Sequence, residues 1–181
     1  FKVFTLIEWF KEGHNANETV GSNNTTYGSN AFKCNGSPIY TDTYPVQDLE
    51  GKTGTMNVVR ATGLSVNQAF VNMASRVDFC KIFQNAYDLG ITEDGEVPTA
   101  YPAIANSGTQ CSPQSISSVS DRDENVLKQY EPSCKSVLEP DIANKTASLL
   151  TASAGQYYTS TKLADGRPYA AKSGTTDYSS N

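Results

Sequence analysis

The sequence predicts a single mixed α/β (α+β) domain, in which helices alternate with short antiparallel strands. Helical spacing of apolar residues recurs at 1–10, 65–74, 79–89 and 140–155. A polar run at 121–125 lies between two short apolar segments, which is typical of a β-hairpin. With 181 residues, of which 38% are hydrophobic, the chain is long enough to enclose a core as one domain.

The first ten residues are apolar almost all round, as in a helix buried inside a domain, and Gly13 ends this helix. Residues 11–60 are mostly polar and predict loop with short irregular pieces. Lys2 is the exception on the apolar helix. A lysine at a helix end usually extends to solvent, but a buried lysine has a lowered pKa and can act as a base.

The second helical pattern begins at Ser65, which is a good N-cap residue, so Ser65 and Asn67 are explained by capping alone. Residues 92–114 contain three prolines and predict turns. Pro140 opens the last helix, which Gly155 is expected to end.

The stretch 169–176 follows a proline and predicts a strand. Lys172 and the hydroxyls of Ser173 and Thr175 surround Gly174, whose bare backbone allows close approach. A cation with hydroxyls and backbone N–H groups suits a ligand that carries a carboxylate and a carbonyl. Alone, the stretch is more typical of a polar surface turn rich in small residues.

Composition excludes several kinds of function. The net charge of -5 and a pI of about 4.8 leave no basic surface for nucleic acid. No apolar run approaches the roughly 18 residues of a membrane span. His14 is the only histidine and no C-x-x-C pair occurs, so neither a zinc site nor a Ser-His-Asp triad is expected. We expect no metal and no cofactor.

The four cysteines favour an extracytoplasmic protein with disulfides. Cys111 and Cys134 bracket the predicted hairpin, and they are the pair we expect. Cys34 with Cys80 follows by elimination, and four free thiols remain the alternative.

The run Gly51-Lys52-Thr53-Gly54-Thr55 is similar to the stretch around Lys172 and invites a phosphate-loop interpretation. That interpretation fails because the first glycine of the pattern would fall at Val46. We expect a turn here.

Three features occur in an order known from penicillin-recognising serine enzymes: S-x-x-K, then S-x-N, then K-[ST]-G. They are Phe1-Lys2 as the end of the first motif, Ser65-Val66-Asn67, and Lys172-Ser173-Gly174. With the segments 1–6, 103–109 and 165–177, they resemble the transpeptidase domain of bifunctional (class A) penicillin-binding proteins. The segment 119–123 and its flanking cysteines are similar to actinobacterial members.

The resemblance covers essentially the whole chain. It implies a penicillin-binding/serine β-lactamase-like fold: an antiparallel sheet flanked by helices, with an all-helical subregion that carries the Ser-x-Asn motif. It implies that residues 1–181 are one incomplete domain, whose nucleophilic serine lies two positions before Phe1. First strands, a glycosyltransferase domain and a membrane anchor would lie upstream, and last strands and a final helix downstream. The location implied is the outer face of the cytoplasmic membrane.

The chemistry implied is D,D-transpeptidation, the cross-linking of peptidoglycan stem peptides that end in D-Ala-D-Ala, with β-lactams as inhibitors. The resemblance makes Lys2 the base that activates the serine, and Ser65 a relay that passes the proton on. The catalytic set implied is Lys2, Ser65, Asn67 and Lys172. The substrate-binding set implied is Ser173, Gly174, Thr175 and Thr176.

Two alternatives stay open. A carboxypeptidase or β-lactamase of the same superfamily would share the motifs, and Glu93 and Glu96 are carboxylates available for deacylation, although in no pattern typical of it. A non-catalytic β-lactam sensor would be acylated without transferring the acyl group.

Overall fold

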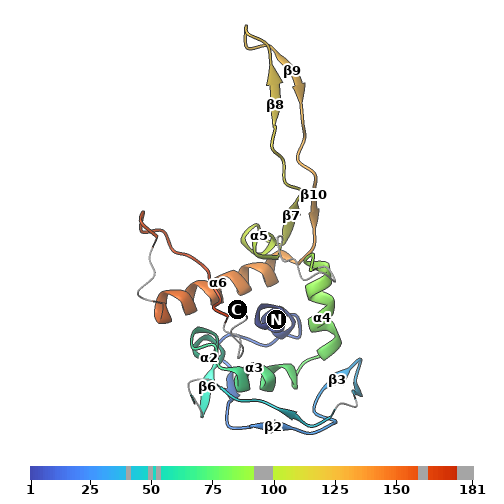
Figure 1. Ribbon diagram of the computed structural model, residues 1–181, viewed down its shortest axis with the longest axis vertical. Helices are drawn as coiled ribbons and strands as arrows, with labels where there is room; N and C mark the ends of the chain where they lie inside the picture. Colours follow the sequence, from blue (N-terminus) through green and yellow to red (C-terminus); the bar gives the residue numbers. More distant parts are fainter. Residues whose placement is uncertain (40–41, 49–50, 52–53, 92–99, 159–162, 175–181) are drawn as a thin grey trace, which may run out of the picture.

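A computed structural model describes residues 1–39, 42–48, 51, 54–91, 100–158 and 163–174 (Figure 1). This part of the chain contains six helices: α1 (Lys2–Lys11), α2 (Val58–Gly63), α3 (Asn67–Ala74), α4 (Phe79–Asp88), α5 (Ala100–Ala105) and α6 (Pro140–Tyr157). Its short strands are β1 (Thr19–Gly21), β2 (Thr26–Tyr27), β3 (Lys33–Cys34), β4 (Ser37–Pro38), β5 (Tyr44–Pro45), β6 (Thr55–Asn57), β7 (Thr109–Cys111), β8 (Ser118–Ser120), β9 (Val126–Gln129) and β10 (Cys134–Ser136).

The strands form small antiparallel pairs rather than one broad sheet. Among the described residues, β1 pairs with β6, β2 with β5, β3 with β4, β7 with β10, and β8 with β9. The combination of helices and small antiparallel strand pairs confirms the predicted α+β class. The predicted loop at 11–60 therefore includes short paired strands.

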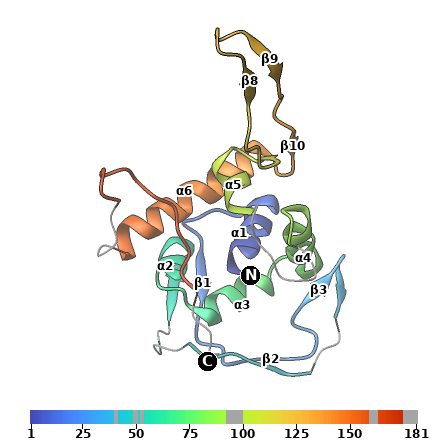
Figure 2. The same cartoon turned by 45° about the horizontal axis from the view of Figure 1, so that its top comes forward.

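Helix α1 forms the centre of the fold (Figure 2). It contacts α3, α4 and α6, and in the view of Figure 2 it lies between α4 and α6. Leu6, Ile7 and Trp9 are completely buried, which confirms the predicted buried helix. Gly13 follows the last turn with a φ of 86°, a conformation that glycine adopts without steric cost, so the helix ends where expected. Burial of this helix on several sides fixes the position of its first residue, Lys2.

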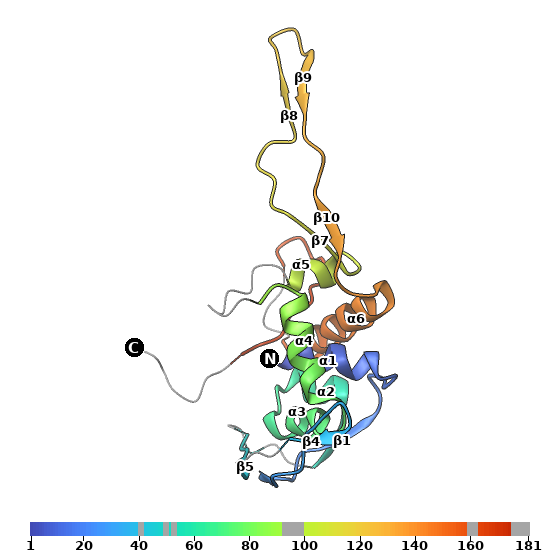
Figure 3. The same ribbon diagram turned by 90° about the vertical axis from the view of Figure 1, so that its right-hand side faces the viewer.

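Residues 109–136 form an arm that extends from the body (Figures 1 and 3). The β7–β10 pair makes its base and the β8–β9 hairpin its tip, as predicted for the segments around 121–125. Cys111 and Cys134 are paired across the base and form a disulfide, which confirms the pairing expected from the hairpin.

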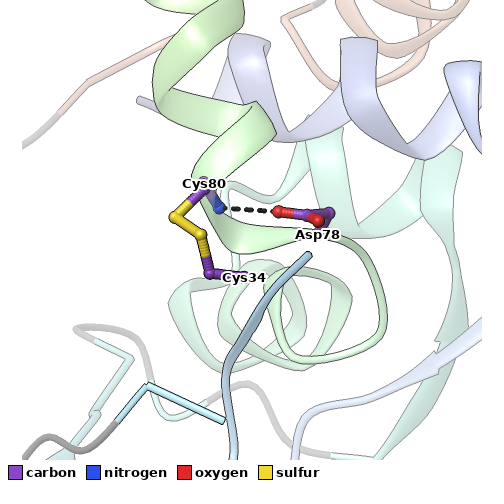
Figure 4. A group of neighbouring side chains, drawn as sticks. All are labelled: Cys34, Asp78 and Cys80. Atoms are coloured by element: carbon purple, nitrogen blue, oxygen red, sulfur yellow. Dashed lines mark hydrogen bonds between the residues drawn. A yellow bond between two sulfur atoms is a disulfide. The ribbon is translucent and has the colours of Figure 1, made fainter. Parts of the chain in front are cut away.

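Cys34 and Cys80 form the second disulfide, so the pairing by elimination is also correct (Figure 4). Asp78 is the N-cap of α4, since its carboxylate accepts hydrogen bonds from the N–H groups of Cys80 and Lys81. In the part of the chain that the structure describes, Cys34, Asp78 and Cys80 are the one group with metal-ligand donors close together. Both sulfurs are already joined to each other.

Two predictions about helices were wrong. The segment 92–114 was expected to be turns, but α5 lies within it. Pro102 is the third residue of α5, where an N–H would have no acceptor within the helix, so the proline costs no hydrogen bond. Helix α6 does not end at Gly155 but continues to Tyr157. The Tyr157 ring packs so closely over Gly63 of α2 that a Cβ there would overlap it, and this contact holds the last turn.

The strand predicted at 169–176 is absent from residues 169–174. Residues 169–174 carry no regular secondary structure, and Thr175 and Thr176 lie outside the described residues. A strand is defined by its hydrogen-bonded ladder, and no described segment pairs with 163–174. None of the described helices is both long and apolar enough to cross a bilayer.

Candidate active site

Lys2 lies at the start of α1 and turns its ammonium group towards the turn between α2 and α3. Its Nζ lies 2.6 Å from the carbonyl oxygen of Ser65, 2.9 Å from Ser65 Oγ and 2.7 Å from Asn67 Oδ1. Three acceptors match the three N–H bonds of an ammonium group. The face of the Phe70 ring lies 5.4 Å from Nζ and shields the cation from water on one side.

Ser65 is not the N-cap that the sequence pattern suggested. Helix α3 begins at Asn67 with Val66 as its N-cap residue, and no side chain caps it. Ser65 has a φ of 56°, in the left-handed region that costs a residue with a Cβ about 1 kcal/mol. Completely buried Val66 anchors this turn, and its N–H donates to the carbonyl of Ala61. The strained turn directs the Ser65 hydroxyl towards Lys2 instead of the helix.

Asn67 uses both ends of its amide. Its Oδ1 accepts from Lys2, and its Nδ2 donates to the carbonyl of Gln47 at 2.9 Å. The backbone N–H of Asn67 donates to the carboxylate of Asp48 at 3.3 Å. These contacts fix the orientation of the amide and therefore the position of the Lys2 ammonium.

Lys172 reaches the same hydroxyl from the other end of the sequence. Its Nζ lies 2.7 Å from Ser65 Oγ and 2.7 Å from the carbonyl oxygen of Ser173. Ser65 is separated by 63 residues from Lys2 and by 107 from Lys172, so the fold alone brings the three groups together.

Both lysines have a lowered pKa. Burial, and to a lesser extent the nearby charge of Lys2, lowers the pKa of Lys172 from 10.5 to about 8. Burial also lowers the pKa of Lys2, while the Asp48 carboxylate opposes that shift. Loss of a proton from either lysine is therefore easier than in water.

The arrangement permits proton transfer through one hydroxyl. Ser65 Oγ lies between two amines, both within hydrogen-bonding distance, so it can donate its proton to one while it accepts a proton from the other. A hydroxyl between two groups of lowered pKa is suited to general acid–base chemistry near neutral pH.

The lowered pKa of Lys172 predicts a pH-dependent stability. Between about pH 8 and pH 10.5 the unfolded chain binds this proton more than the folded chain does. The free energy of unfolding should therefore rise with pH across this window, and it should be constant below it as far as Lys172 is concerned. Lys172→Met should remove this part of the rise, as measured by denaturant titration on either side of the window. Exposed Lys135→Met is the control, and equal profiles for the two variants would contradict the assignment.

The structure brings together five of the residues singled out in the sequence: Lys2, Ser65, Asn67, Lys172 and Ser173. Gly174 follows them on an exposed segment. His14 instead stacks on Trp9 and bonds Glu18, apart from this cluster. The remaining residues named from sequence lie outside the described residues: Thr175, Thr176, Lys52, Thr53, Glu93 and Glu96.

The sequence patterns missed four residues at the site. Gln47 and Asp48 lie in the segment interpreted as loop and hold Asn67. Tyr158 and Tyr169 lie on either side of the polar segment before Lys172, and Tyr158 contacts Ser173. Gln47 and Tyr158 accept hydrogen bonds through their backbone carbonyls. Any residue type provides a carbonyl, so no sequence signal marks these two contacts.

Scans of the sequence against family models and curated proteins found no match. Solved structures do match. PonA1 of Mycobacterium tuberculosis in complex with penicillin V gives a TM-score of 0.70 at 21% identity, over 99% of this chain and 52% of that chain. The D,D-transpeptidase domain of a peptidoglycan glycosyltransferase from Eggerthella lenta gives 0.72 at 15% identity, over 99% and 53%. Penicillin-binding protein A of M. tuberculosis, as an imipenem acyl-enzyme complex, gives 0.62 at 16% identity, over 85% and 42%.

The chain therefore has the fold of the transpeptidase domains of penicillin-binding proteins. The resemblance inferred from the three ordered motifs is confirmed at the level of the fold. The chain spans about half the length of the first two of these structures.

Proposed function

We propose that this chain forms most of the acyl-transfer site of a serine D,D-transpeptidase that cross-links peptidoglycan. The observation that carries the proposal is the convergence of Lys2 and Lys172 on one hydroxyl, Ser65 Oγ, at 2.9 and 2.7 Å. The three motifs supply these groups in the order typical of penicillin-recognising serine enzymes.

In this proposal the nucleophile is a serine two positions before Phe1, on the first turn of the helix that continues as α1. A serine hydroxyl is a weak nucleophile and needs an adjacent base. A lysine three residues later on a helix faces the same side, so Lys2 in its neutral form accepts the serine proton. The lowered pKa of Lys2 supports this role.

The proton then has to reach the leaving nitrogen of the scissile amide. Lys2 passes a proton to Ser65 Oγ, and the Ser65 hydroxyl gives its own proton to the leaving D-Ala amine. Lys172 stabilises the charge that develops on Ser65 Oγ during this transfer. Asn67 keeps Lys2 oriented and offers its amide to the stem peptide.

Ser173, with Thr175, binds the terminal carboxylate of the donor peptide or of a β-lactam. Backbone N–H groups of Thr175 and of the nucleophilic serine hold the oxyanion, a contribution of roughly 3–4 kcal/mol per donor. An amine of a neighbouring stem peptide attacks the acyl-enzyme and completes the cross-link.

We propose that the chain is part of a larger protein. The first strands, a glycosyltransferase domain and a membrane anchor lie upstream, and the site works on the outer face of the cytoplasmic membrane. Two disulfides support an oxidising compartment of this kind.

The test supplies the full-length protein with lipid-linked peptidoglycan precursor and follows cross-linked dimers and released D-Ala. Dimers formed together with D-Ala would support the transpeptidase. Release of D-Ala without dimers would favour a carboxypeptidase, steady hydrolysis of a chromogenic β-lactam would favour a β-lactamase, and acylation without either product would favour a sensor.

A further inference from the structure

Tyr158 lies at the C-terminal end of α6 and contacts the third motif directly. Its hydroxyl oxygen lies 2.8 Å from Ser173 Oγ, and the backbone N–H of Ser173 donates to the same hydroxyl at 3.3 Å. Tyr169 donates its hydroxyl proton to the carbonyl oxygen of Tyr158 at 3.0 Å. Both tyrosines are partly buried, and the bond between them is part-buried, whereas the two bonds from Tyr158 to Ser173 are exposed.

The direction of these hydrogen bonds follows from what each group can donate. A backbone N–H only donates, so the Ser173 N–H occupies a lone pair of the Tyr158 oxygen. The Tyr158 proton is then free to point at Ser173 Oγ. Lys172 Nζ, which also only donates when charged, lies 3.4 Å from the same Oγ.

With Tyr158 and Lys172 both donating, the two lone pairs of Ser173 Oγ are occupied. The proton of Ser173 is left to point away from both, with no acceptor among the described residues. A carboxylate accepts hydrogen bonds and cannot donate them, so this is the state of the hydroxyl that a carboxylate requires.

We propose that Tyr158 is a positioning residue that presents the Ser173 hydroxyl as a donor to the carboxylate of the donor peptide or of a β-lactam. The inference rests on the proposed function and adds Tyr158 and its support Tyr169 to that site. Without the Tyr158 hydroxyl, one lone pair of Ser173 Oγ loses its donor, so the Ser173 proton is no longer held in one direction and the carboxylate loses an oriented donor.

A second reason for the role lies in the backbone. Residues 163–174 have no ladder with any described strand, so side-chain bonds fix Ser173 in this part of the chain. Tyr158 holds both the N–H and the hydroxyl of Ser173, and α6 holds Tyr158. A purely structural tie would affect all ligands, whereas orientation of a donor affects only those with a carboxylate.

The test compares Tyr158→Phe with the parent full-length protein, using a penicillin with a free carboxylate and the methyl ester of the same penicillin. Loss of one oriented hydrogen bond is expected to lower the second-order acylation rate for the free acid roughly five- to tenfold. The rate for the ester should change by less than about twofold, because its neutral carbonyl gains little from the donor. The ester rate also reports on folding, since a misfolded variant would lose both.

Tyr157→Phe is the matched control, because no described residue hydrogen-bonds the hydroxyl of Tyr157, although its ring packs on Gly63. It should leave both rates unchanged. Tyr169→Phe should lower the free-acid rate less than Tyr158→Phe does, and in the same ligand-dependent way.

Equal losses with both ligands, or no loss with the free acid, would overturn the role of Tyr158. A parent protein that neither ligand acylates would overturn the proposed function and, with it, the inference. The parent rates therefore distinguish the two failures.

Discussion

Lys2→Ala is expected to lower the rate of acylation by labelled penicillin by about a thousandfold. Removal of a general base typically costs between about a hundredfold and ten-thousandfold. Lys2 is the group that joins Ser65 Oγ and Asn67 Oδ1, at 2.9 and 2.7 Å, and no other described residue contacts both. The measurement is the rate of covalent labelling of the full-length protein.

Two further variants test whether Lys2 acts as a base or only as a positive charge, and whether it is the right lysine. Lys2→Arg keeps a cation but has no accessible neutral form, so its loss should match that of Lys2→Ala. Lys52→Ala, from the similar Lys52-Thr53-Gly54 run, should keep nearly the full rate. Equal losses from the Lys2 and Lys52 substitutions would mean that the wrong lysine has been assigned.

Ser65→Ala is expected to lower the acylation rate by about a hundredfold or more, because it removes the hydroxyl through which the two lysines are connected. The same substitution leaves Lys2 bound to the Ser65 carbonyl and Asn67 Oδ1, and Lys172 bound to the Ser173 carbonyl. Because Lys2 keeps these contacts, the loss of rate reports on the missing hydroxyl and not on a displaced base.

The left-handed backbone of Ser65 provides a matched partner, Ser65→Gly. Glycine adopts a φ of 56° without the steric cost that serine and alanine carry, so this variant should be at least as stable as Ser65→Ala. Both variants lack the hydroxyl, so the acylation rate should fall by the same factor in each. Recovery of activity in the glycine variant would show that backbone conformation, not the hydroxyl, explains the loss.

Much of the fold was accessible to sequence reasoning because local pattern and tertiary packing agree. The apolar residues of α1 predicted a buried helix, and the helical pattern at 79–89 predicted α4. The hairpin at 121–125 predicted that Cys111 and Cys134 would meet, and they do.

The errors arise where tertiary contacts override local preference. Ser65 has the chemistry of an N-cap, yet buried Val66 holds the turn so that its hydroxyl faces Lys2. Gly155 is a typical helix terminator, but the packing of Tyr157 on Gly63 extends α6 past it. Neither contact has a signature in the local sequence.

The residues of the candidate site also fall into those that the sequence predicted and those that it did not. Lys2, Ser65, Asn67 and Lys172 were found because their spacing is typical of an ordered motif set. Tyr158 was missed because its role depends on the path of 163–174, which brings Ser173 back to the end of α6. No periodicity predicts such a path.

The most direct test of the central claim identifies the residue that becomes acylated. The full-length protein is labelled with penicillin and digested, and the labelled peptide is sequenced by mass spectrometry. The account predicts one penicilloyl group, on a serine two positions before Phe1. A label on Ser65, on any other residue, or on none would contradict it.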